Sequence, residues 1–469
     1  MPPPPPSTLI RRACAIATCD DRRTRLRGAS ILVTGNRIVA IGDESTFTVP
    51  AGTRIIDASR CVALPGFVNT HHHMYQTLTR ALPAVQSAKL FDWLVTLYEV
   101  WREITPEAVY TGALVGLGEL LLTGCTTTTD HHYLFPAQTS GDLIDEEFRA
   151  AERLGIRFHP TRGSMSRGRS HGGLPPDDVV QTPDTILRDS ARVIDQHHDA
   201  TPFSMRRVAL APCSPFSVTS DLMRETARLA RDRRVRLHTH LAETADEDAY
   251  CLEVYGKRPV ALMEELGWIG DDVWFAHCVF LNEEEIRLFA RTRTAVAHCP
   301  SSNMRLASGI APVPALLREG APVGLAVDGS ASNDSSNMLA ELRQALLLHR
   351  VLGGAAAITV DDVLWMATRG GAAALGRDEI GSLAPGKAAD IALFNVDRIG
   401  FAGAVHDPIA ALVLCGDSQI AETVLCNGQV VVEAGRLVFE EEARIVEQAN
   451  TCARQLVERA TARTGISFL

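Results

Sequence analysis

Three consecutive histidines near residue 70 are the first residues in the chain whose types and spacing could bind a metal. His71 and His73 are two positions apart in Pro65-Gly-Phe-Val-Asn-Thr-His-His-His. On an extended strand, residues two apart project from the same face, and His72 between them points away. Paired imidazoles suit a borderline ion such as zinc. The pair is a weak signal by itself, because a metal site needs further ligands from other strands.

Further metal-binding and acid–base residues occur later in the chain, each at the end of an apolar stretch. His240 closes His238-Thr-His240, and Glu243 follows three residues later. His277 follows Val-Trp-Phe-Ala, and Asp328 follows Leu-Ala-Val. A lone carboxylate such as Asp328 would be costly to bury unless it is paired or bound to metal. Each histidine could be an ordinary core residue, but that interpretation does not explain the shared position at strand ends.

The elements that must position these residues alternate between strand and helix from about residue 61 to residue 376. Thr105-Pro106 is typical of an N-cap and first helical residue, and Asn282 with Glu285 of a capping box. Eight such repeats predict an α/β fold, a (β/α)8 TIM barrel, with its chemistry at the carboxyl ends of the strands. The expected strand ends are His71/His73, Asp130, Arg162, Cys213, His240, His277, His298 and Asp328.

Strand-like segments at both ends of the chain predict a second, smaller domain. Thr34-Gly35-Asn36 and Asn427-Gly428 are hairpin signals between β-rich runs. We therefore expect a small β-sandwich domain built from both termini. The predicted organisation is a disordered Pro-rich tail at 1–7, the small β domain at 8–62 and 377–440, the metal-dependent hydrolase barrel at 63–376, and a C-terminal helix at 441–469.

Composition excludes several classes of protein. The 469 residues carry a net charge of −10, so no basic surplus is available for nucleic acid. The sequence contains no apolar run of roughly 20 residues, the length that a membrane helix needs. Eleven cysteines without a CxxC pair, and a proline-rich start unlike a secretory signal, favour a reducing, cytoplasmic setting.

Five motifs in this order resemble the signature set of the amidohydrolase superfamily. They are Pro65-Gly-Phe-Val-Asn-Thr-His-x-His, His240-x-x-Glu243, Phe275-Ala-His277, His298-Cys-Pro-Ser-Ser-Asn and Val327-Asp328-Gly-Ser. The resemblance runs from about residue 8 to residue 445. Within the superfamily, the motifs resemble more specifically those of the mononuclear-zinc branch, which contains purine, pyrimidine, adenosylhomocysteine and triazine deaminases and hydrolases.

The resemblance implies a role for each matching residue. His71, His73, His240 and Asp328 would be the metal ligands, Glu243 the proton shuttle, and His277 the group beside the attacked carbon. Asp328 would also act as a base. Dinuclear members carry a bridging lysine on strand four, but Arg207-Val-Ala-Leu-Ala-Pro-Cys213 has none. We therefore expect one divalent metal ion, with Zn²⁺ favoured.

Within this branch the motifs are most similar to those of 8-oxoguanine deaminases and next to those of triazine hydrolases. The presence of both Glu243 and Asp328 favours hydrolytic deamination of an oxidised purine, 8-oxoguanine to urate and ammonia. Triazine hydrolysis, deamination of guanine or S-adenosylhomocysteine, and a non-catalytic metal-binding module stay open as alternatives. The resemblance also implies a homodimer or higher homo-oligomer. Candidate contacts to the heterocyclic small-molecule substrate are Gln76, Tyr133, Cys213 and Trp93.

Overall fold

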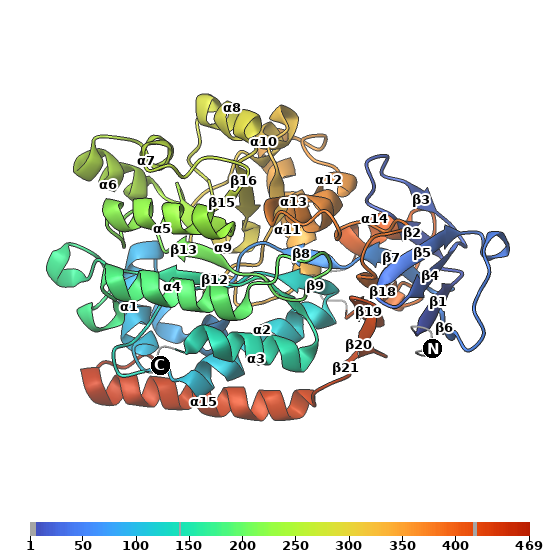
Figure 1. Ribbon diagram of the computed structural model, residues 1–469, viewed down its shortest axis with the longest axis horizontal. Coiled ribbons are helices and arrows are strands. Elements are labelled where there is room, and N and C mark those ends of the chain that lie inside the picture. The colour runs from blue at the N-terminus through green and yellow to red at the C-terminus, as the bar shows by residue number, and fades with distance from the viewer. Residues whose placement is uncertain (1–5, 140–141, 416–419) are drawn as a thin grey trace.

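A computed structural model describes residues 6–139, 142–415 and 420–469 of this chain. Seven parallel strands form the main sheet of its large α/β part (Figure 1). Each strand pairs in parallel with the next along the order β10-β12-β13-β14-β15-β16-β17. The strands are β10 (His131–His132), β12 (Thr161–Ser164), β13 (Ala209–Pro212), β14 (Arg236–Leu241), β15 (Val273–His277), β16 (Ala295–His298) and β17 (Val323–Leu325). The predicted α/β class with a parallel sheet is confirmed.

Three more parallel strands, all of them before β12 in the chain, pair in the order β11-β9-β8: β8 (Phe67–Asn69), β9 (Cys125–Thr128) and β11 (Arg157–Phe158). The second and third expected strands are thus each interrupted, as β9/β10 and β11/β12. Pro160 lies in the second gap and has no N–H to donate to a ladder, which accounts for that break. Beside the first strand, Thr70 donates its N–H and its hydroxyl to the Leu325 carbonyl at 3.2 and 3.0 Å.

Helices surround these strands in the ribbon view (Figure 1). The predicted signals for two of them hold, since the Thr105 hydroxyl accepts from Ala108 N and Asn282 with Glu285 forms a capping box. The helices of this part are α1 (Leu90–Trp101), α2 (Pro106–Leu122), α3 (Leu143–Leu154), α4 (Pro183–His197), α5 (Ser220–Arg233), α6 (Ala245–Tyr255), α7 (Pro259–Glu265), α8 (Glu283–Thr292), α9 (Pro300–Arg305), α10 (Val313–Glu319), α11 (Met338–Gly353), α12 (Val360–Trp365) and α13 (Gly371–Ala374).

Two sheets form a smaller β-rich part that draws strands from both ends of the chain (Figure 1). One sheet has the order β5-β4-β1-β6: β1 (Ser7–Arg11), β4 (Ser30–Thr34), β5 (Arg37–Gly42) and β6 (Arg54–Asp57). The other has the order β21-β20-β19-β18-β7-β2-β3: β2 (Ala15–Ala17), β3 (Arg25–Leu26), β7 (Cys61–Pro65), β18 (Ile391–Asn395), β19 (Thr423–Cys426), β20 (Gln429–Glu433) and β21 (Arg436–Leu437). Helix α14 (Pro408–Leu414) connects β18 to β19 along the chain.

The apolar stretch before the three histidines is two strands, not one. β7 pairs antiparallel with β18 in the β-rich part, whereas β8 pairs with β9 in the α/β part. Gly66 separates them, and a Cβ built there would lie 2.1 Å from the Thr126 hydroxyl oxygen, so only glycine fits this crossing. The strand ends at Asn69, and the histidines follow it.

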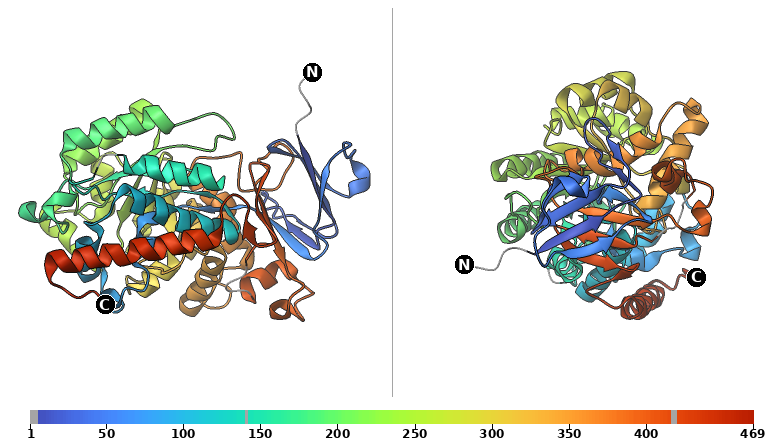
Figure 2. Two further views of the ribbon diagram at one scale, coloured as in Figure 1. Left: turned by 90° about the horizontal axis from the view of Figure 1, so that it is seen from below. Right: turned by 90° about the vertical axis from the view of Figure 1, so that its right-hand side faces the viewer.

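The chain ends also differ from the expected spans. Residues 1–5 of the expected tail lie outside the described residues, but Ser7 already belongs to β1. The expected terminal helix is α15 (Glu442–Thr464), which packs along α1 and α2 (Figure 2). The domain boundaries themselves stay predictions.

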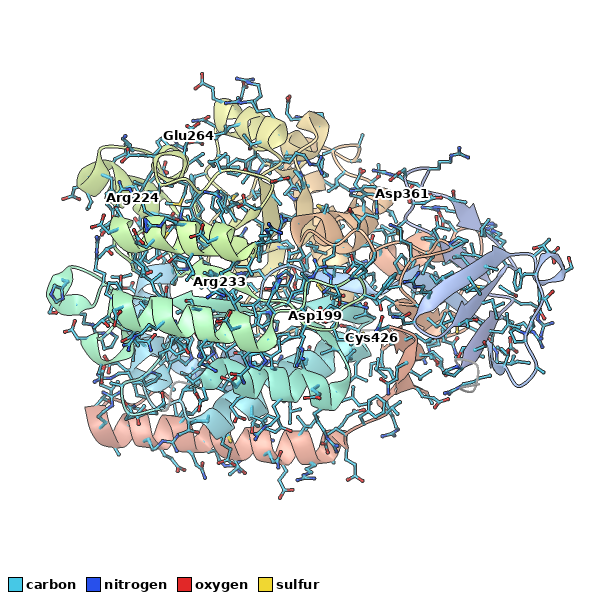
Figure 3. All side chains as sticks on the ribbon, in the orientation of Figure 1. Asp199, Arg224, Arg233, Glu264, Asp361 and Cys426 are labelled. Atoms are coloured by element: carbon cyan, nitrogen blue, oxygen red, sulfur yellow. The ribbon has the colours of Figure 1, made fainter. Side chains whose placement is uncertain are left out.

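The β-rich and α/β parts meet through buried side chains. Cys426 of β19, labelled in Figure 3, donates its thiol to the Thr126 carbonyl at 3.3 Å. Arg157 of β11 binds Asp390 at the same junction, and both side chains are buried. All eleven cysteines are free thiols. Among the described residues, no helix combines the length and the apolar character needed to span a membrane.

Candidate active site

Five of the residues expected at strand ends come together at one end of the parallel strands. His71 and His73 follow β8, His240 lies in β14, His277 ends β15, and Asp328 lies three residues beyond β17. Two groups of potential ligand atoms, each within 4.8 Å of one another, share His71: one is His71, His73, His131 and His240, and the other is His71, His277 and Asp328. Parallel topology therefore gathers residues that are up to 257 positions apart in sequence.

The hydrogen bonds of His73 and His240 fix which ring nitrogen carries the proton. His73 Nδ1 lies 2.7 Å from the His131 carbonyl, and His240 Nδ1 lies 2.6 Å from the Cys213 carbonyl. A carbonyl only accepts, so both Nδ1 atoms carry hydrogen. Burial lowers the pKa of His73 to about 4 and that of His240 well below its usual value, so both rings are neutral. Their Nε2 lone pairs then face each other across 3.1 Å.

His71 presents a third lone pair at the same place. The His238 Nδ1–H donates to the Trp274 carbonyl at 2.9 Å, which leaves His238 Nε2 as an acceptor. That acceptor takes the His71 Nδ1–H at 2.7 Å. The His71 Nε2 atom is therefore unprotonated, and it is buried without a hydrogen-bond partner.

Asp328 completes the set with a carboxylate. Its Oδ1 lies 3.3 Å from His71 Nε2 and 3.4 Å from His73 Nε2. Asp328 is 4% exposed, so its carboxylate is buried among these rings. The three converging imidazole lone pairs have no donor, and the carboxylate beside them accepts the Gly329 N–H at 2.6 Å and the Ser332 hydroxyl at 3.4 Å. A divalent cation would be held by such a cluster of nitrogen and oxygen acceptors. The donor set therefore fits a divalent metal ion.

His277, Glu243 and Asp328 form an acid–base group beside these ligands. His277 Nε2 lies 3.6 Å from Glu243 Oε2 and 3.9 Å from Asp328 Oδ2. Burial would lower the pKa of His277, but the two carboxylates and its Nδ1 hydrogen bond raise it overall. Burial raises the pKa of Glu243, which favours a protonated carboxyl. The group can hold and move a proton among three side chains.

Backbone strain marks the same place. His277 and Asp328 adopt φ values of 71° and 62°, which non-glycine residues rarely adopt. Such strain concentrates at functional sites, where the surrounding contacts hold it in place.

Two side chains that position this group were not predicted from the sequence. Asn303 of α9 accepts the His277 Nδ1–H through its Oδ1 at 2.9 Å, and so turns Nε2 toward the carboxylates. The Ser308 hydroxyl donates to Glu243 Oε1 at 3.2 Å. Asn303 stands in the quoted His298-Cys-Pro-Ser-Ser-Asn motif, so that motif was the available signal. No sequence signal marked Ser308.

The site opens into a cavity whose empty space, counted together with the open solvent at its mouth, is about 430 Å³. All four candidate substrate contacts line this cavity: Gln76, Tyr133, Cys213 and Trp93. Further lining residues, which were not predicted, are Leu90, Leu94, Phe216, Leu306 and Ser332. Apolar and aromatic walls next to a few polar groups suit a planar ring.

The four candidates offer different chemistry to a ligand. Gln76 Oε1 is buried without a hydrogen-bond partner and is thus an acceptor in need of a donor. The Trp93 indole N–H already donates to the Ala331 carbonyl at 3.1 Å, so this residue offers only its ring. Tyr133 packs edge-on against the His73 ring, with centroids 5.1 Å apart. The Cys213 carbonyl is occupied by His240.

Other histidines lie outside the cavity. The His72 Nε2 atom lies 2.8 Å from the Ser336 hydroxyl, so His72 points away from the ligand cluster, as the spacing predicted. His298 Nε2 lies 3.0 Å from His349 Nε2. His131 lies at the site, since its ring stacks on His240 with centroids 4.7 Å apart.

Comparisons with known proteins agree with this geometry. Residues 62–431 match the amidohydrolase family. The chain is 48% identical to the 8-oxoguanine deaminase of Pseudomonas aeruginosa, over 96% of this chain and 99% of that protein. It is 38% identical to an isoxanthopterin deaminase from an unknown prokaryotic organism, over 91% of this chain and 92% of the relative.

A solved structure shares the fold along almost the whole chain. It is the atrazine chlorohydrolase from Arthrobacter aurescens complexed with zinc, with a TM-score of 0.91 and 38% identity, over 95% of this chain and 100% of that chain. From the family match, these similarities and the cluster of ligand and acid–base residues together, we conclude that this chain is a hydrolase that belongs to the amidohydrolase family.

Proposed function

We propose that the protein catalyses zinc-dependent hydrolytic deamination of an oxidised purine, 8-oxoguanine to urate and ammonia. The observation that carries this proposal is the placement of Glu243 and Asp328 beside His277, at 3.6 and 3.9 Å from its Nε2 atom. Deamination needs an acid for the ring nitrogen and a base for water in one site. The 48% identity to an 8-oxoguanine deaminase supports the substrate class.

His71, His73, His240 and Asp328 would hold the metal, and zinc suits this nitrogen and oxygen donor set. When bound, the ion supplies a Lewis acid that lowers the pKa of water toward neutrality. His71 keeps its lone pair directed at this place through its hydrogen bond with His238, and His240 does so through the Cys213 carbonyl.

The proton steps belong to the carboxylates and His277. Asp328 Oδ2 accepts a proton from the attacking water, and His277 orients that water through Nε2. Glu243 donates its proton to the ring nitrogen beside C2, which makes C2 electrophilic. A new C–O bond forms at C2, and the C–N bond to the exocyclic amine then breaks. Asp328 returns its proton to that amine, so that ammonia leaves. The proton of the new C2 hydroxyl passes back to Glu243 as the C2 carbonyl forms.

Substrate recognition is proposed for the polar groups that line the cavity. The buried Gln76 Oε1 acceptor suits a ring N–H or an exocyclic amine. Tyr133 and Trp93 supply aromatic walls, and Cys213 and His240 also line the cavity. One water added to 8-oxoguanine gives urate plus ammonia, so no further reactant is needed.

Hydrolysis of a triazine is the second candidate. The structural similarity to the zinc-complexed atrazine chlorohydrolase favours it. A chloride leaving group needs no proton, whereas an amine does, so the buried base and acid of this chain favour the deaminase.

The test is ammonia release by metal-loaded protein from 8-oxoguanine, guanine, isoxanthopterin and S-adenosylhomocysteine, with chloride release from a chlorotriazine measured in parallel. We expect efficient turnover of 8-oxoguanine over guanine. Turnover of the chlorotriazine, with none of any purine or pterin, would reject the proposal.

We further propose that the parallel strands close into a (β/α)8 barrel and that the β-rich part is a sandwich. The Thr70–Leu325 hydrogen bonds support closure between the first and last strands. A buried apolar cluster that includes Ile10 and Ile31 of one sheet and Ile391 of the other supports the sandwich. A homodimer or higher oligomer stays a prediction, which light scattering can test.

A further inference from the structure

Glu247, on the first turn of α6, holds the backbone of the turn that carries Glu243. Its Oε1 accepts the Ala242 N–H and its Oε2 accepts the Glu243 N–H, both at 2.9 Å. The side chain is 1% exposed. Its own N–H donates to the Thr244 hydroxyl, the N-cap of α6, at 3.4 Å. Glu247 thus joins the helix start to the two residues that follow β14.

This turn has a strained conformation that needs such a support. Ala242 adopts a φ of 51°, in the left-handed region that favours glycine. Ala242 is fully buried and Glu243 is 5% exposed, so their N–H groups have little access to water. Unpaired buried amides are costly. Removing the carboxylate would leave two such donors and release the turn.

The geometry points to a role beyond stability: we propose that Glu247 is the positioning residue that sets the reach of the Glu243 carboxyl toward His277. This inference rests on the proposed role of Glu243 as proton shuttle. The carboxyl of Glu243 lies 3.6 Å from His277 Nε2, so a small rotation of the turn changes that approach. Misplacement of a catalytic group by about 1 Å can cost on the order of 10²-fold in rate.

Both oxygens of Glu247 must act as acceptors. Glutamine offers one carbonyl oxygen as an acceptor and one NH2 group as a donor. The NH2 group would face the backbone N–H of Ala242 or Glu243, which is itself a donor. Glu247→Gln therefore keeps the size of the side chain and removes one of the two bonds. Glu247→Asp keeps two acceptors on a shorter stem.

The experiment is a double-mutant cycle of Glu247→Gln with Glu243→Gln, measured as kcat for ammonia release from 8-oxoguanine, with bound metal measured for each variant. We expect Glu247→Gln to lower kcat by about 10²-fold in the wild-type background. In the Glu243→Gln background it should lower kcat by less than about twofold, because no shuttle is left to position. Metal content should stay at the wild-type level in all three variants.

Glu285 provides the matched control. It occupies the same position in α8, and its Oε2 accepts the Asn282 N–H at 2.8 Å in a turn that carries no proposed site residue. Glu285→Gln should lower the unfolding temperature and leave kcat unchanged. If Glu247→Gln does not fold, Glu247→Asp supplies the test, with a smaller loss of kcat and full metal content.

Each remaining outcome overturns the inference. An equal loss of kcat in both backgrounds would show a purely structural role for Glu247. A Glu247→Gln enzyme within twofold of wild type, beside a slow Glu243→Gln enzyme, would reject the positioning role alone. Wild-type turnover by Glu243→Gln would reject the proposed mechanism together with this inference.

Discussion

The Nε2 atoms of His73 and His240 lie 3.1 Å apart, and the other hydrogen bonds of both rings leave each of these atoms with a lone pair. Two acceptors in contact repel unless a proton or a metal ion lies between them. The unpartnered Nε2 of His71 adds a third acceptor at the same place. The hydrogen-bond network thus orients the ligand atoms before any ion binds, as outer-shell partners of metal ligands do.

Metal removal is expected to abolish turnover and to destabilise the protein. At a free metal concentration of 1,000 times Kd, binding contributes about 4 kcal/mol to the free energy of unfolding, which a chelator removes. Activity and unfolding temperature should return with about one equivalent of Zn²⁺. The exposed His171→Ala variant should bind metal as wild type does, whereas His240→Ala should not. Full activity of the metal-free protein would contradict the assignment.

Glu243→Gln is expected to retain its metal and to lose turnover by about 10²–10⁴-fold, the usual contribution of general acid–base catalysis. Glutamine keeps the shape of the side chain and can still accept from Ser308, but it cannot deliver a proton to a ring nitrogen. Metal analysis and kcat on the same preparation separate the two effects. An unchanged rate would remove Glu243 from the role of shuttle.

Asn303→Ala is expected to lower kcat by about 10-fold or more with metal retained, because His277 loses the acceptor that orients its ring. Asn303→Asp keeps an acceptor at the same place, so it should retain more activity than the alanine variant. A negative charge there should also raise the pKa of His277 further and shift the pH–rate profile. Equal rates for the alanine and aspartate variants would show that the hydrogen bond does not matter.

The clustering of these polar residues could be predicted because parallel strands place their carboxyl ends together, whereas their roles as ligands and acid–base groups stay predictions. His240, His277 and Asp328 each follow an apolar run, and alternation of strand and helix is sufficient to bring such ends to one edge. The supporting residues could not be predicted in this way. Glu247 and Ser308 act through a helix start and a loop, and their partners depend on backbone paths that no periodicity encodes. Likewise, only the packing of Gly66 against Thr126 shows that the first apolar stretch divides between two sheets.

Gly329→Ala is expected to weaken substrate binding by displacing Gln76. A Cβ at position 329 would lie 1.9 Å from Gln76 Oε1 and 3.0 Å from His73 Cδ2. The longer and more flexible Gln76 side chain gives way first, so KM should rise more than kcat falls. Gln76→Ala should reproduce the rise in KM without the added methyl group. A Gly329→Ala enzyme with unchanged KM would exclude Gln76 from substrate contact.

A buried carboxyl behind the site makes stability depend on pH in an unusual direction. Glu147 of α3 is fully buried, and its Oε1 lies 2.9 Å from His132 Nδ1. The His132 Nε2–H donates to the Leu134 carbonyl, so a neutral His132 needs a donor at Nδ1, which a protonated Glu147 supplies. Burial raises the pKa of Glu147 to about 8 from the ordinary 4.5.

The free energy of unfolding of Glu147→Gln, relative to that of the wild type, should therefore increase as pH rises. Between pH about 4.5 and 8 the unfolded chain releases the Glu147 proton and the folded protein keeps it, so this group lowers the free energy of unfolding as pH increases. The limiting slope for one proton is about 1.4 kcal/mol per pH unit. Glutamine donates to His132 at every pH and carries no such penalty. Denaturant unfolding of both proteins at pH 5 and pH 8 should show that the free energy of unfolding of the variant, relative to that of the wild type, is higher at pH 8 than at pH 5. Parallel pH dependences of the two proteins would show that Glu147 ionises in the folded protein as it does in the unfolded chain.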